Sequence, residues 1–128
     1  DARTVDVLLP AQTRADFCSL APHRTYEFHA AGEQRTRVYL LRLGNAEFVG
    51  IQPEVSSSFG AAVRAARFCP VLFATLVNGG QKYLPAPDAY EKITYEAMNS
   101  GFAAGSHERL LQTILAALNA ARQKGELA

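Results

Sequence analysis

The segment from Arg37 to Ile51, RVYLLRLGNAEFVGI, carries the clearest strand signals in this chain. It contains two runs typical of β-strands, 37–43 and 46–51, on either side of the turn-forming pair Gly44-Asn45. Apolar runs separated by a short connection that contains glycine are typical of a β-hairpin. We therefore predict two antiparallel strands joined at Gly44 and Asn45.

Beyond the hairpin, the hydrophobic period changes from that of a strand to that of a helix. After Pro53-Glu54, the spacing of apolar residues predicts a helix, with the three serines 56–58 as a possible N-cap region. The apolar stripe of this helix comprises Val55, Phe59, Ala62, Val63 and Ala66. Pro70 stops this helix, and the apolar run 71–77, VLFATLV, predicts a strand suited to the centre of a sheet. The turn Asn78-Gly79-Gly80 ends that strand.

The two ends of the chain add one strand and one helix. Residues 4–9 predict a strand that ends at Pro10. Ser106 is a candidate cap of a helix that runs to Gly125, with one apolar face made by Leu110, Leu111, Ile114, Leu115, Leu118 and Ala121. This order of strands and helices favours a single α/β unit over residues 1–128, with helices packed on one face of a mixed sheet.

Composition and charge narrow the classes of function. At 128 residues and 48% hydrophobic content, the chain has room for one domain with a real core. Its 13 basic and 12 acidic residues are scattered, and Arg35 and Arg37 are expected on the solvated face of a strand. A nucleic-acid platform needs a clustered basic surface, so we expect no nucleic-acid partner.

The apolar runs, the first residues and the cysteines bear on the compartment and the processing of the chain. No apolar run reaches the roughly 20 residues of a membrane span, and residues 1–12 lack the pattern of a signal peptide. Because the sequence begins at Asp1, we expect a processed product, a trimmed chain or a piece of a longer protein. Cys18 and Cys69 allow one disulfide if the compartment is oxidising, and two buried free thiols fit the sequence at least as well.

Three of the five tyrosines lie in one segment, 78–100, which Pro85 and Pro87 break and which we expect to be a loop and not a helix. A phenol donates or accepts a hydrogen bond, and binds a metal ion once a cation lowers its pKa from about 10. Glu54 follows one predicted strand and Tyr83 follows the next. In α/β sheets, ligands lie at the carboxyl ends of strands, so we expect this acid and this phenol at one edge.

These residues resemble the C-terminal part of the catalytic domain of the neutral or alkaline (non-lysosomal) ceramidases. In that family, a strand leads to a Pro-Gly-Glu element with a zinc-binding glutamate, and the matching stretch here is GIQPEVSSSFGAAV, 50–63, with Glu54 at the ligand position. The family's zinc-binding tyrosine is followed by tyrosines seven and twelve residues on, and here these are Tyr83, Tyr90 and Tyr95. The resemblance covers roughly residues 37–118.

The chain also departs from the family pattern. Pro53 replaces the glycine before the glutamate, Leu84-Pro85 replaces two threonines, and Ala104-Gly105 stands where the family has Gly-Pro. Zinc binding tolerates these changes more easily than the identity of the substrate does. A related hydrolase of another amide or ester is therefore kept as an alternative.

The resemblance implies a zinc-dependent hydrolase of an N-acyl amide bond that acts in sphingolipid metabolism. Glu54 and Tyr83 would be zinc ligands, and Tyr95 the catalytic tyrosine that hydrogen-bonds the amide carbonyl. Glu96 and Tyr90 would orient these groups. By resemblance, the substrate is a lipid or another N-acyl amide, the enzyme contacts a membrane surface, and its location is secreted, periplasmic or at the cell surface.

The family's two zinc-binding histidines have no counterpart here. His23, His29 and His107 do not occupy the motif positions, and His107 is expected to be a surface residue in the first turn of the last helix. The resemblance therefore implies that the N-terminal part of the same enzyme, or a second processed chain, completes the site. The competing interpretation is a non-catalytic α/β module that binds a partner and holds no metal, with Glu54 as an acid at a helix N-terminus and the tyrosines as packing residues.

Overall fold

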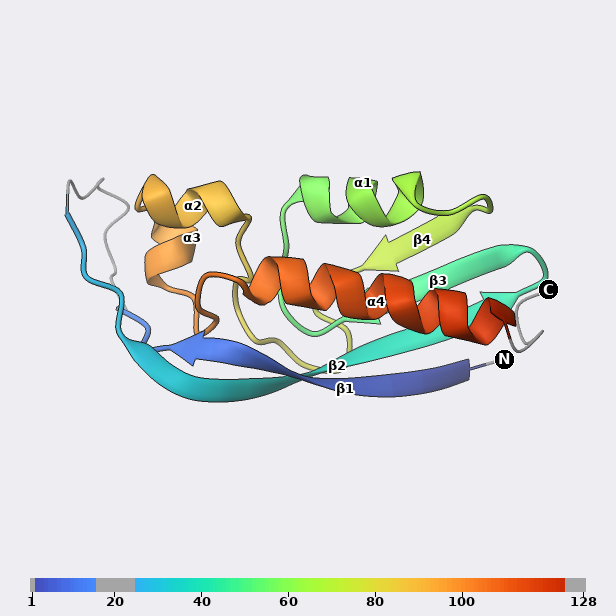
Figure 1. Cartoon of the computed structure of the whole chain (residues 1–128), viewed down its shortest axis with the longest axis horizontal. Coiled ribbons are helices and arrows are strands. Elements are labelled where there is room, and N and C mark those ends of the chain that lie inside the picture. Colours follow the sequence, from blue (N-terminus) through green and yellow to red (C-terminus); the bar gives the residue numbers. More distant parts are fainter. Residues whose placement is uncertain (1, 16–24, 124–128) are drawn as a thin grey trace.

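A single mixed sheet with helices packed on it makes up the protein in the computed structural model, which describes residues 2–15 and 25–123 (Figure 1). The strands are β1 (Ala2–Gln12), β2 (Ala30–Leu43), β3 (Ala46–Ile51) and β4 (Val71–Ala74), in the order β1-β2-β3-β4. The first two pairings are antiparallel, whereas β3 and β4 are parallel. The predicted α/β class with a mixed sheet is confirmed.

The predicted hairpin is β2 and β3. Leu43 pairs with Ala46 at its closed end, and Gly44 adopts a φ of 59°, which glycine tolerates at no steric cost. Further along, Leu40 faces Val49 and Val38 faces Ile51, all of them buried. The alternation of the two strands therefore supplies one wall of the core.

Among the described residues, the helices are α1 (Ser57–Ala65), between β3 and β4, and α2 (Pro87–Glu91), α3 (Tyr95–Met98) and α4 (Ser106–Gln123), after β4. Figure 1 shows α4 running along β1 and β2, with α1 beside β4 and the short pair α2 and α3 at the far end of β1. The core lies between the sheet and the helices α1 and α4. It comprises Val7, Leu9, Val38, Leu40, Val49, Ile51, Phe59, Val63, Leu84, Phe102, Leu110, Ile114 and Leu118.

The first strand differs from the prediction because it continues through Pro10 to Gln12. β1 is an edge strand, where a missing N–H does not break the sheet. The Pro10 carbonyl accepts hydrogen bonds from the Ala103 amide (2.8 Å) and the Ser106 hydroxyl (2.8 Å). The prediction that Ser106 caps α4 was therefore wrong, since its hydroxyl ties the start of the helix to β1.

The run 71–77 was also wrongly predicted to be a central strand. β4 ends at Ala74 and lies at the edge of the sheet, and its residues alternate between half-buried and exposed. Leu76, with a φ of 58°, turns the backbone out of the extended conformation. The run is apolar throughout because one face of β4 packs on the core, while its other face is also apolar but stays exposed.

The segment 78–100 contains helices, contrary to the expectation of a loop. Pro87 occupies the first turn of α2, where its missing N–H has no intrahelical partner to lose. Thr94 caps α3 by accepting a hydrogen bond from the Ala97 amide (3.2 Å). Within the described ranges, no helix is long and apolar enough to cross a bilayer.

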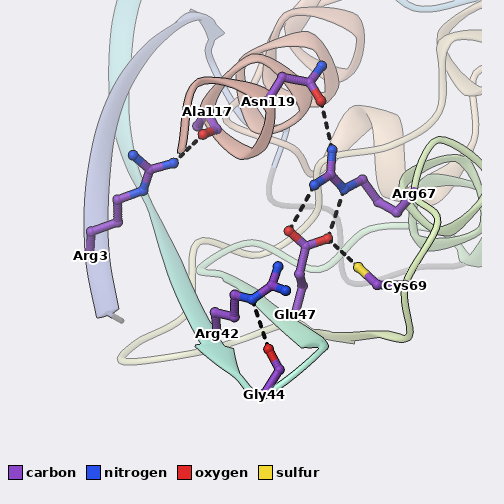
Figure 2. A network of polar contacts seen from close by, with 8 residues as sticks. All are labelled: Arg3, Arg42, Gly44, Glu47, Arg67, Cys69, Ala117 and Asn119. Atoms are coloured by element: carbon purple, nitrogen blue, oxygen red, sulfur yellow. Dashed lines mark hydrogen bonds and ion pairs between the residues drawn. The ribbon is translucent and has the colours of Figure 1, made fainter. Parts of the chain in front are cut away.

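A buried ion pair holds the crossover between β3 and β4 (Figure 2). Arg67, just after α1, donates two hydrogen bonds to the Glu47 carboxylate of β3, at 2.8 and 3.0 Å. Only 1% of the Glu47 side chain and 5% of the Arg67 side chain are exposed. Arg67 also donates to the Asn119 side chain on α4 (2.7 Å), so one cation connects the sheet, the crossover and the last helix.

The thiol of Cys69 completes this network. Cys69 is free, and its Sγ donates to Glu47 Oε1 at 2.9 Å. Burial and the neighbouring Glu47 carboxylate raise the pKa of Cys69, so the thiol keeps its proton. Burial alone would raise the pKa of Glu47, but the hydrogen bonds from Arg67 and Cys69 more than offset it and leave this pKa lowered. Cys18 lies outside the described residues.

We predict that Arg67→Met lowers the free energy of unfolding by about 3–5 kcal/mol, because it leaves the Glu47 carboxylate buried without a partner. The double variant Glu47→Leu/Arg67→Met should recover most of this loss. Denaturant unfolding measures both. The matched control is Arg37→Ala, which breaks the exposed ion pair with Asp6 (2.7 Å) and should cost far less, because solvent screens this pair. A loss no larger than that of the control would contradict a structural role for the buried pair.

His107 lies in the first turn of α4 as predicted, but it is not a surface residue. Only 12% of its side chain is exposed, and its ring packs edge-on against Phe59 of α1, with 5.0 Å between ring centroids. Its Nε2 is buried without a hydrogen-bond partner among the described residues. Burial lowers the pKa of His107, while the Glu108 carboxylate, 4.0 Å from Nδ1, opposes this shift.

Because the folded protein holds His107 neutral, we predict that stability falls as the pH drops below about 6.5, the ordinary pKa at which the unfolded chain takes up the proton. His107→Phe should remove this part of the pH dependence, and His29→Gln, at an exposed position, is the matched control. Thermal unfolding between pH 7.5 and 5.5 measures the effect. An equal slope in the parent and in His107→Phe would show that the buried imidazole is not responsible.

Candidate functional site

Glu54 and Tyr83 lie side by side just beyond the carboxyl ends of β3 and β4. The two residues form an isolated parallel β-bridge, in which the Glu54 amide donates to the Lys82 carbonyl (2.7 Å) and the Leu84 amide donates to the Glu54 carbonyl (2.8 Å). Lys82 adopts a φ of 53°, which turns the chain immediately before Tyr83. The expected meeting of an acid and a phenol at this edge is confirmed.

A pocket of about 390 Å³ opens beside this bridge. We call it the site pocket. Glu54 and Glu96 line it with carboxylates and Tyr83 lines it with a phenol. An apolar wall is made by Val55, Pro85, Ala86 and Ala89. Asp88 and Lys92, which also line it, form an exposed ion pair of 3.0 Å. The arrangement offers acidic and phenolic oxygens next to a surface suited to an apolar group.

Tyr95 packs against Tyr83. The two ring centroids are 6.0 Å apart with planes at 71°, which is an edge-to-face contact. Tyr95 begins α3 and Glu96 is its next residue, so the cap at Thr94 positions both relative to Tyr83. The structure therefore brings together four of the five residues singled out from the sequence: Glu54, Tyr83, Tyr95 and Glu96.

The surroundings of Tyr83 are unfavourable for a phenolate. Burial raises the pKa of Tyr83, and the neighbouring Tyr95, Glu54 and Glu96 raise it further. The phenol therefore keeps its proton at neutral pH unless a cation occupies this place. A site that accumulates oxygen donors and negative charge in this way favours positive ligands.

Buried polar residues that the sequence analysis missed hold the tyrosine segment. The Ser100 hydroxyl donates to the Tyr83 carbonyl (2.7 Å), and the Gln12 side chain donates to the carbonyls of Ala97 (2.8 Å) and Ser100 (3.0 Å). The Asn99 side chain donates to the Tyr95 carbonyl (3.0 Å). Gln12, Asn99 and Ser100 are at most 5% exposed. Gln12 could not be identified from the sequence, because it lies far from the tyrosine segment along the chain and no local pattern links β1 to α3.

Tyr90 lies outside the site pocket. Its hydroxyl donates to the Phe102 carbonyl at 2.6 Å, and its ring contacts Phe28 edge-on with centroids 5.6 Å apart. Burial raises the pKa of Tyr90 to about 12. Tyr90 thus braces α2 against the segment before α4, and any influence on the site passes through that packing.

Neither of the two histidines among the described residues lines the site pocket. His29 is exposed, His107 packs against Phe59, and His23 lies outside the described residues. Within residues 2–15 and 25–123, no group of three or more His, Cys, Asp or Glu side chains is arranged to hold a metal ion. Glu54 and Tyr83 therefore stand as a pair of adjacent oxygen donors.

Comparisons with known proteins address the fold. No protein-family model and no curated protein matches the chain. Among solved structures, the chain is similar to a protein described as a ceramidase complexed with C2, with a TM-score of 0.60 and 20% sequence identity. The match covers 73% of this chain but 15% of that ceramidase chain. The mixed α/β fold described above is therefore similar to one part of a much larger ceramidase.

Proposed function

We propose that this chain supplies part of the active site of a zinc-dependent hydrolase that cleaves an N-acyl amide bond, as the resemblance to neutral or alkaline ceramidases implies. The observation that carries the proposal is the Glu54–Tyr83 bridge, because it joins the two residues proposed as ligands from separate segments. A fold similar to part of a solved ceramidase supports the same assignment. The proposed cofactor is zinc.

The residues present fit such a metal in part. Zinc accepts carboxylate oxygens, and a phenolate oxygen is the anionic form of the group that Tyr83 offers. The raised pKa of Tyr83 reflects burial and nearby acids, and a cation bound here would reverse that effect. Catalytic zinc keeps about three protein ligands, so the N-terminal part of the same enzyme, or a second processed chain, must supply the others.

Each residue has a distinct role in the proposed reaction. Zinc, when bound, supplies an activated water near neutral pH. Glu54 would hold the metal through its carboxylate, and Tyr83 would hold it as the phenolate. Tyr95 donates a hydrogen bond to the amide carbonyl oxygen, where negative charge develops as the carbonyl is attacked. Glu96, beside it in the site pocket, orients these groups.

The substrate class follows from the pocket wall and from the resemblance. Val55, Pro85, Ala86 and Ala89 suit an apolar chain next to the amide, as in a lipid with an N-acyl group. Leu84-Pro85 differs from the family pattern, so a panel of ceramide and short N-acyl amides tests which substrate is preferred. Action on such a lipid at a membrane surface, outside the cytoplasm, is part of the proposal.

We predict that the complete gene product binds about one zinc ion per molecule and that the double variant Glu54→Ala/Tyr83→Phe loses it. Metal analysis after gel filtration measures the content. In the parent, zinc affinity should rise with pH because the phenol must lose a proton, and Tyr83→Phe should flatten this dependence.

The control for this experiment is Tyr90→Phe, which removes a tyrosine hydroxyl outside the site pocket. It should cost about 1 kcal/mol of stability and leave the zinc content unchanged. Equal zinc in the parent and in the double variant would remove the metal role of Glu54 and Tyr83. The non-catalytic partner-binding module would then be the better account.

For Tyr95→Phe in the complete enzyme, we predict a fall in kcat of about 10²-fold, because one hydrogen-bond donor to the developing oxyanion is lost. The KM and the zinc content should change little, since the ring and its contact with Tyr83 remain. Steady-state hydrolysis of an N-acyl sphingoid substrate measures both constants. An unchanged kcat would assign Tyr95 to packing alone.

A further inference from the structure

The face of the sheet that points away from α1 and α4 carries two neighbouring rows of mostly apolar residues. Register places one row of residues across all four strands: Ala2 pairs with Leu41, Leu41 with Phe48, and Phe48 with Leu72. The next row along the strands comprises Thr4, Tyr39, Gly50 and Ala74. We call these two rows, with the adjoining Leu43, the open apolar face.

Large side chains on this face are exposed in the chain as it stands. The exposed fractions are 37% for Leu41, 58% for Leu43 and 57% for Leu72. The rows border a hollow of about 670 Å³. An antiparallel sheet with one solvated face normally carries polar side chains there, whereas strands apolar on both faces are typical of sheets covered on both sides. Contiguous exposed apolar surface of this kind marks an interaction site.

The open apolar face has a charged border. In the following row, Asp6 pairs with Arg37, and their side chains form an exposed ion pair of 2.7 Å. Beyond it, Leu8 lies opposite Arg35. This side of the sheet thus changes from apolar to charged from one row to the next. An apolar partner can cover the surface only up to this border without burying charge.

We propose that the open apolar face packs against a further layer of the same catalytic domain, one that presents an apolar surface of strands or helices. The match to the solved ceramidase carries the choice of occupant. The match covers only 15% of that chain, so most of that ceramidase lies outside it and is protein able to form such a layer. Two-layer and three-layer packing is the usual way in which an α/β sheet covers both faces.

The inference rests on the proposed function in one respect, since it takes this chain to be part of a larger enzyme. It is independent of the zinc chemistry, because no residue of the open apolar face lines the site pocket. It identifies where the rest of the enzyme docks. A layer docked on this face would fix the position of the sheet, and with it that of Glu54 and Tyr83, relative to the remaining metal ligands.

Thiol labelling of the complete gene product tests the proposal with a matched pair. Leu72 and Leu8 are 57% and 51% exposed in this chain, on the apolar and the charged side of the border. In the complete protein, Leu72→Cys should react with a maleimide at least about 20-fold more slowly than Leu8→Cys, after correction for the parent's own cysteines. Equal rates would overturn the proposal.

Two further measurements keep the test decisive. Hydroxyl-radical footprinting of the unsubstituted protein should protect the peptide that contains Leu72 and not the peptide that contains Leu8, and it needs no variant to fold. Sedimentation analysis should find the same molecular mass for the parent and for Leu72→Glu. A parent dimer that this substitution dissociates would assign the face to a second copy of the chain and overturn the proposal.

Discussion

The parallel pairing of β3 with β4 is the constraint on which the rest of the structure depends. Parallel neighbours need a crossover, and α1 provides it. Because the two strands run in the same direction, the residues after them leave the sheet at one edge, where Glu54 meets Tyr83. At the opposite end of the same pair, Glu47 and Arg67 hold the start of β3 against the end of the crossover. A buried ion pair therefore sits at one end of this unit and the candidate site at the other.

The edge-to-face contact of Tyr83 with Tyr95 links the sheet edge to the short helices α2 and α3. Ile93 joins these helices with a φ of 51°, which is unusual for a β-branched residue. Lys82 is in the same region of backbone space just before Tyr83. Backbone strain of this kind persists where surrounding contacts over-determine it. Here the Lys82 carbonyl accepts from the Glu54 amide (2.7 Å), and the Ile93 amide donates to the Tyr90 carbonyl (3.3 Å). The site pocket is thus built on a braced segment.

Local sequence signals predicted much of this architecture and misjudged parts of it for physical reasons. The hairpin at Gly44 and the common edge of Glu54 and Tyr83 followed from turn chemistry and strand direction. The central position assigned to 71–77 failed because an apolar run does not reveal whether its second face is covered. Burial of His107 and the hydrogen bonds of Gln12 depend on contacts between distant segments, which no local period encodes. The roles of Glu54, Tyr83, Tyr95, Glu96 and Tyr90 stay predictions.

We propose that Glu54 and Tyr83 bind one metal ion together. A crystal structure of the complete gene product, with anomalous diffraction recorded on either side of the zinc absorption edge, tests it most directly. We expect one zinc peak about 2.0–2.2 Å from a Glu54 carboxylate oxygen and at a similar distance from the Tyr83 phenolic oxygen. A zinc peak bound elsewhere, or none at this edge of the sheet in zinc-loaded crystals, would contradict it.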